Sequence, residues 1–86
     1  MQHNIKIAKC FADVVYSGEK TFEVRKNDRG YQKGDTVLFE VVDNTPYAVI
    51  NLTHPLNGVE FEITYVLHEW GLEDEFVAFS IKRKED

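Results

Sequence analysis

The sequence predicts a small, mainly β domain of the α+β kind: a pseudo-barrel of five to six strands, with one short N-terminal helix plugging one end. Its 86 residues, 43 % of them hydrophobic, are enough for one domain over residues 1–86 and for a single core. Most apolar segments alternate with polar residues at period two, and only one early segment follows the helical period. Strands that do not alternate with helices favour a curved sheet that closes toward a barrel and so protects its edges.

The first two elements are a short strand and a short helix. Residues 4–7 alternate apolar with polar side chains, which is typical of a strand. In the next ten residues, Phe11, Val14 and Val15 are spaced as on one face of a helix, and Gly18 follows where a left-handed C-cap is expected. A helix over 8–17 has only about two and a half turns, so it needs a packing partner to persist.

Two further strands are expected in the middle of the chain, separated by a loop. Residues 21–26 return to period two, with the polar side chains on one face. The segment 27–35 is rich in glycine and turn-forming polar residues and is therefore a loop. Residues 36–42 are β-branched or aromatic almost without interruption, which predicts a strand buried on both faces.

The last third of the chain predicts two more strands. A turn over 43–46 precedes residues 47–53, which the pattern leaves open as a strand or as part of an irregular excursion. Residues 59–67 alternate most clearly, and the expected apolar face consists of Val59, Phe61, Ile63 and Tyr65. After an acidic loop, residues 76–81 form the last strand and 82–86 a solvated tail.

The charge is divided along the chain. The formal net charge is -5, which argues against bulk attraction to phosphate polymers. Residues 20–33, however, hold five bases and two acids, for a net +3, while the remaining residues hold five bases and thirteen acids, for a net -8. A local cationic surface on an acidic body is therefore expected.

Compartment and partners follow from what the composition excludes. Cys10 is the one cysteine, so no internal disulfide forms and a reducing, cytoplasmic location is expected. No apolar run is long enough to span a membrane, and residues 1–9 do not resemble a signal peptide. The three histidines lack the close spacing of metal ligands, so neither a metal nor another cofactor is predicted. We expect a monomer.

The segment with most information runs from Gly18 to Arg29. The two-residue step from Glu23 to Arg25 places a carboxylate and a guanidinium side by side on one strand face, with Lys20 at the strand entrance. A carboxylate between two cations should stay ionised and hold both in place. Such a face suits a nucleotide, with Glu23 accepting a hydrogen bond from a base or sugar. An ordinary surface ion-pair ladder is the alternative.

These residues resemble a known family. The string Gly-x-Lys-Thr-Phe-Glu-x-Arg at 18–25 is similar to the signature of the ASCH (activating signal cointegrator homology) superfamily, whose members have a PUA-like barrel. The longer string through Arg29, with Tyr31, Gly34 and Asp35, resembles a small bacterial and phage branch known only as a domain of unknown function. The resemblance implies a cleft between helix and barrel, proposed in the superfamily to bind RNA, lined here by Lys20, Glu23 and Arg25.

One branch of the superfamily implies catalysis instead. Its members resemble acetylcytidine amidohydrolases and use the motif lysine with a threonine nucleophile three residues later. In this chain Glu23 stands at that position, and Thr21 is at the wrong step. Two neighbouring cations would also weaken Glu23 as a general base. A small hydrolase acting on a modified nucleoside therefore remains an alternative to a binding module.

Several other residues are candidates for the same site. Asn27 could donate to a phosphate or base, or could instead form an Asx-type turn. Arg29 and Lys33 are candidates for positioning phosphate. Tyr31 and Trp70 could stack on a base, or could instead cover the core. The resemblance places His3 where it could line the cleft, with an exposed terminal histidine as the alternative; Thr21 is a second candidate lining residue.

The sequence therefore favours an RNA- or nucleotide-binding module, in which a few phosphate contacts combine with base-edge or stacking contacts. A third interpretation is a protein-interaction or phage accessory module that uses the acidic residues between 69 and 75.

Overall fold

A computed structural model describes residues 1–43, 45–47 and 49–84. Within them the chain forms five strands and one helix: β1 (Gln2–Ala8), α1 (Lys9–Ser17), β2 (Phe22–Lys26), β3 (Thr36–Val42), β4 (Glu60–His68) and β5 (Phe76–Arg83). Every expected strand but the uncertain one over 47–53 is present, and the loop over 27–35 is confirmed. Ala48 lies outside the described residues, and the described part of this segment makes one isolated bridge, between Val42 and Ile50.

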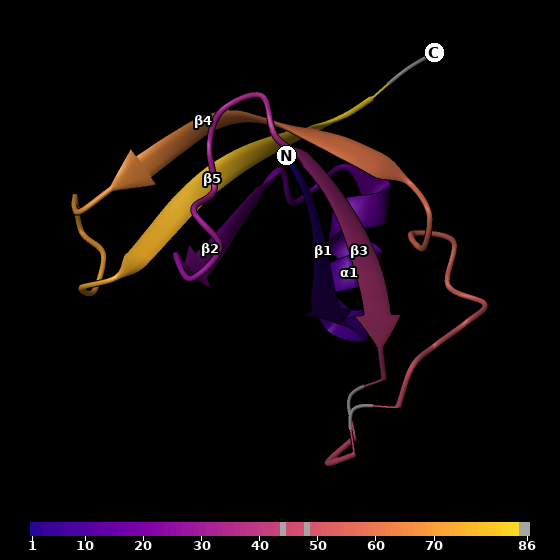
Figure 1. Cartoon of the computed structure of the whole chain (residues 1–86). Coiled ribbons are helices and arrows are strands. Elements are labelled where there is room, and N and C mark those ends of the chain that lie inside the picture. The colour runs from indigo at the N-terminus through magenta and orange to yellow at the C-terminus, as the bar shows by residue number, and fades with distance from the viewer. Residues whose placement is uncertain (44, 48, 85–86) are drawn as a thin grey trace.

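The five strands form one sheet in the order β1-β3-β4-β5-β2. The chain leaves β1, passes through α1 and β2, and returns as β3, so β1 and β3 pair in parallel, while the other neighbours are antiparallel. The sheet is curled into a half-barrel (Figure 1). In the described part of the chain β1 and β2 are its edges, and the expected mainly β fold is confirmed.

One hydrophobic core fills the concave side of the sheet. Alternate apolar residues of every strand but β2 point inward, and apolar residues of α1 and of two loops add to them. Val37, Phe39 and Val41 of β3 are buried, but Glu40 is exposed, so the expected burial of this strand on both faces is wrong. The outer face of β3 is therefore partly open.

The helix ends where the sequence predicted but buries a different face. Gly18 has φ +86° and donates its N–H to the carbonyl of Val15, which confirms the left-handed C-cap. Ala12 and Val15 are buried against the core, whereas Phe11 is 53 % exposed. The helix lies against β1 and β3 (Figure 1). The small side chain of Ala12 fits this close packing, which turns Phe11 toward the edge strand β2.

β4 departs from the expected alternation at one point. Phe61 and Ile63 are buried as expected, but Tyr65 is 62 % exposed. The pairing of β4 with β5 shifts register between Ile63 and Tyr65, as at a β-bulge. The extra residue reverses the direction of the side chains that follow, so Val66 packs on the core instead of Tyr65.

The irregular segment between β3 and β4 is fixed to the helix. His54 is buried, and its Nδ1 accepts the backbone N–H of Leu56, so Nε2 carries the proton and donates to Asp13 Oδ1 at 2.7 Å. This hydrogen bond, with a second from Lys9, lowers the pKa of Asp13. Leu56 is fully buried. The segment is therefore part of the fold.

The last strand is longer than the sequence predicted. β5 continues to Arg83, whose Nη2 donates to the carbonyl of Tyr16. Lys82 and Arg83 are exposed, as expected of a solvated segment, but they belong to a strand and not to a tail; Glu85 and Asp86 lie outside the described residues. Of the helices in the described ranges, none is both long and apolar enough to cross a membrane.

Gly18→Ala tests the helix end. A Cβ at Gly18 meets no atom within 4 Å, so the cost is that of an alanine held at positive φ, about 1 kcal/mol. Urea unfolding should show this loss with an unchanged m value, and Gly18→Asn, which tolerates the left-handed region, should lose less. Equal stability of Gly18→Ala and the parent chain would contradict the C-cap.

Candidate functional site: a charged groove between β1 and β2

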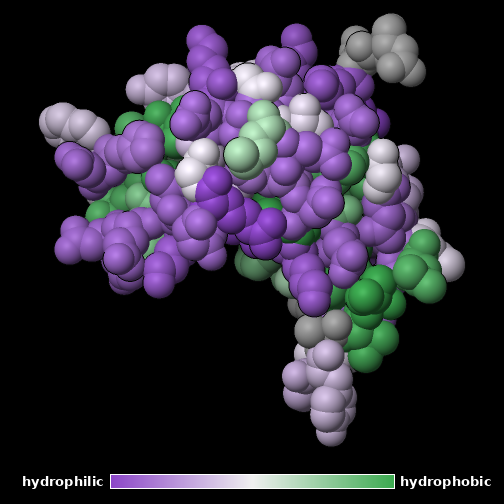
Figure 2. Space-filling view, in the orientation of Figure 1, coloured by the Kyte–Doolittle hydropathy of each residue, from purple (hydrophilic) through white to green (hydrophobic). Residues whose placement is uncertain are grey.

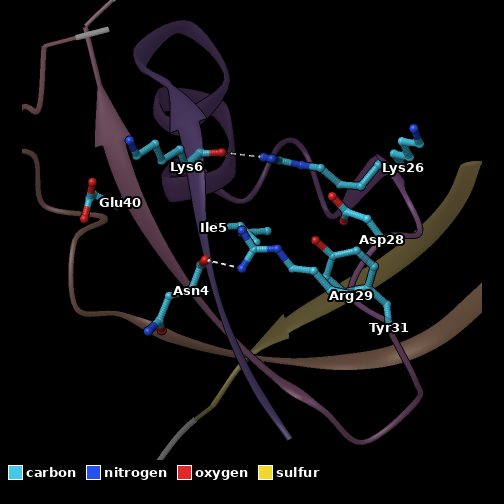
Figure 3. A pocket seen from close by; sticks show the side chains of 9 residues that line it. Asn4, Ile5, Lys6, Lys26, Asp28, Arg29, Tyr31 and Glu40 are labelled. Carbon is cyan, nitrogen blue, oxygen red and sulfur yellow. Dashed lines mark hydrogen bonds between the residues drawn. The ribbon is translucent and has the colours of Figure 1, made fainter.

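The open side of the half-barrel lies between the edge strands β1 and β2. Alternate residues of a strand direct their backbone groups to the same side, and the carbonyls of Asn4 and Lys6 point away from β3. Arg25 of β2 donates from Nη2 to Lys6 O at 2.8 Å, and Arg29 donates from Nη1 to Asn4 O at 2.7 Å. Figure 3 shows both hydrogen bonds crossing the gap. The two guanidinium groups thus take the place of the backbone N–H donors that a neighbouring strand would supply in a closed barrel.

A buried carboxylate holds the first of these arginines. Glu23 is only 4 % exposed, and its two oxygens accept from Lys20 Nζ at 2.5 Å and from Arg25 Nε at 3.0 Å. The expected arrangement of a carboxylate between two cations is present. Because Glu23 is buried, these ion pairs differ from an exposed surface ladder.

The polar face of β2 points inward, which reverses the usual arrangement of a sheet. Phe22 and Val24, on the opposite face, are 49 % and 48 % exposed. Lys20 Nζ lies 5.0 Å from the ring centroid of Phe22 and 5.6 Å from that of Phe11, and it also donates to the carbonyl of Phe22. Two half-exposed aromatic rings therefore flank the motif lysine.

Two adjoining cavities run along this gap. The first, of about 550 Å³, is lined by four bases, Lys6, Arg25, Lys26 and Arg29, and by two acids, Asp28 and Glu40, with uncharged residues between them. The second, of about 500 Å³, is lined by Lys20, Glu23 and the apolar side chains Ala8, Phe11, Phe22 and Val24. Both are also lined by Lys6 and Arg25, so we treat them as one groove, cationic at one end and apolar at the other.

The structure separates the candidate residues into two groups. Lys20, Glu23, Arg25 and Arg29 line the groove. Asn27 does not: its Oδ1 accepts the N–H of Tyr31, and its own N–H donates to Glu75 O, as in the alternative of a structural turn. Lys33, Thr21 and Trp70 are exposed and line neither cavity.

Tyr31 and His3 belong to the core. Tyr31 also lines the first cavity, but it is only 3 % exposed and its ring centroid lies 4.7 Å from those of both His3 and Phe79, so it does not offer a free face for stacking. Burial raises the pKa of its hydroxyl. His3, also 3 % exposed, lines neither cavity, and it is not an exposed terminal histidine either. Both aromatic residues serve to close the core beneath the groove.

His3 is paired with Asp35 of the motif. Its Nε2 lies 2.7 Å from Asp35 Oδ2, which also accepts the N–H of Gln32. Burial alone would raise the pKa of Asp35, but the hydrogen bond from His3, with smaller contributions from other donors, holds that pKa below its ordinary value. The pair fixes the loop between β2 and β3 against β1.

Sequence reasoning missed several lining residues, among them Phe11, Phe22 and Lys6. The half-exposed rings were assigned to apolar faces, and Lys6 lies in a strand whose partner was unknown. A signal for Phe22 existed, since it neighbours Glu23 on a strand that must turn one face to solvent.

Among the residues that the structure describes, the other chemistry-bearing side chains form no second site of comparable organisation. A cavity of about 250 Å³ beside the acidic loop is lined by Glu69, Glu73, Asp74 and Glu75 among others. Within the described ranges, no group of three or more His, Cys, Asp or Glu side chains is placed to hold a metal ion.

The fold and groove define a small, mainly β domain with a charged groove at the open side of its sheet. The chain belongs to the family described as a domain of unknown function (DUF3850), which matches residues 2–81. Over 36 residues it is also 42 % identical to an uncharacterized 12.9 kDa protein in GpA 3'region of Escherichia phage P2. That match covers 42 % of this chain and spans 33 % of the phage protein's length.

Glu23→Ala should destabilise the protein by about 2 kcal/mol, because it leaves the cations of Lys20 and Arg25 without their partner. The loss is smaller than the roughly 3–5 kcal/mol of a fully buried pair, since these side chains remain 19 % and 28 % exposed. Chemical denaturation measures the change, with Glu19→Ala at an exposed position as the control. Equal stabilities of the two variants would show that the ion pairs are not structural.

Asp35→Asn should give a pH-dependent loss of stability. A lowered pKa in the folded state means that the contribution of Asp35 is present above its unfolded pKa of about 3.9 and disappears as the pH falls through the folded pKa. The difference in unfolding free energy between parent and variant should therefore be full above about pH 5 and shrink on acidification. A difference that grows toward low pH would contradict the pairing with His3.

Proposed function

We propose that this protein is a binding module for RNA or a nucleotide, and that the ligand lies in the groove between β1 and β2. The observation that carries the proposal is the pair of fixed arginines. Arg25 and Arg29 each use one nitrogen on a β1 carbonyl, at 2.8 Å and 2.7 Å. A guanidinium has five N–H donors, so each keeps donors for a phosphate.

Fixing the arginines in advance favours binding. A free arginine loses rotamer entropy when it binds an anion, at a cost of about 0.5–1.5 kcal/mol for each side chain ordered. Arg25 is already held from two sides, by Glu23 and by Lys6 O. Less entropy is then lost on binding, which supports affinity with few contacts.

The charges of the groove suit a ligand with few phosphates. Four bases and two acids line its cationic end, on a chain with a net charge of -5. We expect two or three phosphate contacts and thus a shallow dependence on salt, because each contact releases less than one counterion. A duplex would require a wider basic surface.

The apolar end of the groove supports recognition of a base. The rings of Phe11 and Phe22 are about half exposed, and base stacking on such a ring contributes about 1–3 kcal/mol. These rings, rather than Tyr31, are the stacking candidates that the groove offers.

The resemblance to the ASCH superfamily points in the same direction, because it implies an RNA-binding cleft beside the helix of a PUA-like barrel. The proposal extends to a monomer in the bacterial cytoplasm. For a hydrolase, Glu23 would have to act as a base, but both of its oxygens are engaged by cations. We therefore place binding ahead of catalysis, and ahead of a protein-interaction role for the acidic loop.

Binding is tested by titrating the protein with short single-stranded RNA and following the backbone amides by NMR. Residues around Lys6, Phe22 and Arg25 should shift first. Lys26→Ala, which leaves both β1 carbonyl contacts intact, should weaken binding about threefold to tenfold, and Lys82→Ala, far along β5, should not. The slope of log Kd against log salt should be about 2.

The outcomes separate the alternatives. No shift with any RNA or nucleotide overturns the proposal. Conversion of a modified nucleoside, followed by chromatography, together with its loss in Glu23→Gln, would establish the hydrolase instead.

A further inference from the structure

A third cavity adjoins the groove, on the outer side of β1 and β3. It measures about 410 Å³, and its apolar wall is formed by Leu38, Ile50 and Leu52. Asn4 and Glu40 line both this cavity and the cationic end of the groove. The cationic end therefore has an apolar cavity on each side: one with Phe11 and Phe22, and one with Ile50 and Leu52.

The wall of this third cavity carries apolar side chains that are exposed to solvent. Ile50 is 45 % and Leu52 is 84 % exposed, and Val49 beside them is 52 % exposed. Hydrophobic side chains gather at the lower right of the view in Figure 2, where Figure 1 shows the segment between β3 and β4. Contiguous exposed apolar surface is a recurring feature of binding sites.

The segment that carries these residues is held in place. Asn57 Oδ1 accepts the N–H of Val41 at 2.9 Å, and Asn57 Nδ2 donates to Asn51 O at 2.6 Å. His54 anchors the same segment on α1 through Asp13, at 2.7 Å. The apolar wall is thus a fixed surface, which a ligand can use without ordering it first.

The order apolar, cationic, apolar matches the chemistry of base, phosphate, base. We infer that the ligand is a dinucleotide step of single-stranded nucleic acid, with its phosphodiester at Arg25 and Arg29 and one base in each apolar cavity. This inference rests on the proposed function, because it assigns the ligand of the same groove.

The charge of Glu40 determines which group lies at the third cavity. A carboxylate at the boundary repels a second phosphate but accepts a hydrogen bond from the exocyclic amine of a base. Glu40 is exposed, and Lys6 is its partner in the register of β1 with β3. The pair favours a ligand with one anionic centre and an amino-bearing base beside it.

The test compares ligands that carry the same number of phosphates. Isothermal titration is carried out with nucleoside 5′-monophosphates and with ribodinucleoside monophosphates, on the full chain and on three variants. Phe22→Ser alters the first apolar cavity and Leu52→Ser alters the third. Tyr47→Ser is the matched control, since Tyr47 lies in the same segment, is 86 % exposed and lines neither cavity.

The inference predicts that the best dinucleoside monophosphate binds about tenfold more tightly than the best mononucleotide, because a second base buries apolar surface in the third cavity. Leu52→Ser should remove this gain and leave mononucleotide binding unchanged, Phe22→Ser should weaken both ligands, and Tyr47→Ser should weaken neither. Leu52 is so exposed that its replacement does not threaten folding, which a melting curve verifies.

Three results would overturn the inference. If both ligand classes bind equally and Phe22→Ser weakens both, the proposed function stands but the second base has no site. If the tenfold gain persists in Leu52→Ser, the second base lies elsewhere. A dimer that dissociates in Leu52→Ser, detected by sedimentation, would assign the apolar wall to a second copy. Failure of every ligand to bind would instead remove the proposed function itself.

Discussion

The carbonyl groups on the free edge of β1 require hydrogen-bond donors, and two arginines supply them. A sheet that curls without closing leaves polar backbone groups unpaired on both edge strands, and such edges invite pairing with other chains. Arg25 and Arg29 cap Lys6 O and Asn4 O from the opposite side of the gap. The contacts that protect the edge therefore also place two cations at the opening, so one arrangement serves both the fold and the groove.

The contact of Arg25 with β1 determines which side chains of β2 point inward. Arg25 can reach β1 only if its side chain points inward, and a cation pointing inward needs a buried anion, which is Glu23. Because side chains alternate along a strand, Phe22 and Val24 must then face solvent. A strand that exposes its apolar residues is less favourable for folding, and such local conflicts concentrate at functional sites. The exposed Phe22 ring is thus a consequence of the edge contact.

Local patterns predicted what depends on neighbours in sequence. The end of α1 at Gly18, the bounds of β3 and the position of Glu23 between two cations all follow from spacing or turn chemistry. Contacts between distant segments could not be predicted in this way. The burial of Tyr31 depends on its packing on Phe79, 48 positions later in the chain, and the outward turn of Tyr65 depends on a register shift against β5. Because burial decides which aromatic rings can contact a ligand, the structure offers Phe11 and Phe22 as stacking candidates in place of Tyr31.

Under the proposed function, the groove reconciles an acidic protein with an anionic ligand. Long-range attraction is weak at a net charge of -5, so binding must rest on contacts that are short and already formed. Fixed guanidiniums satisfy this requirement, since their geometry favours a phosphate even where the average potential does not. The apolar walls on both sides then contribute binding free energy in proportion to the area that they bury, and this contribution does not depend on salt. On this proposal the groove selects its ligand by shape and stacking rather than by the number of its charges, unlike basic proteins that bind any phosphate polymer.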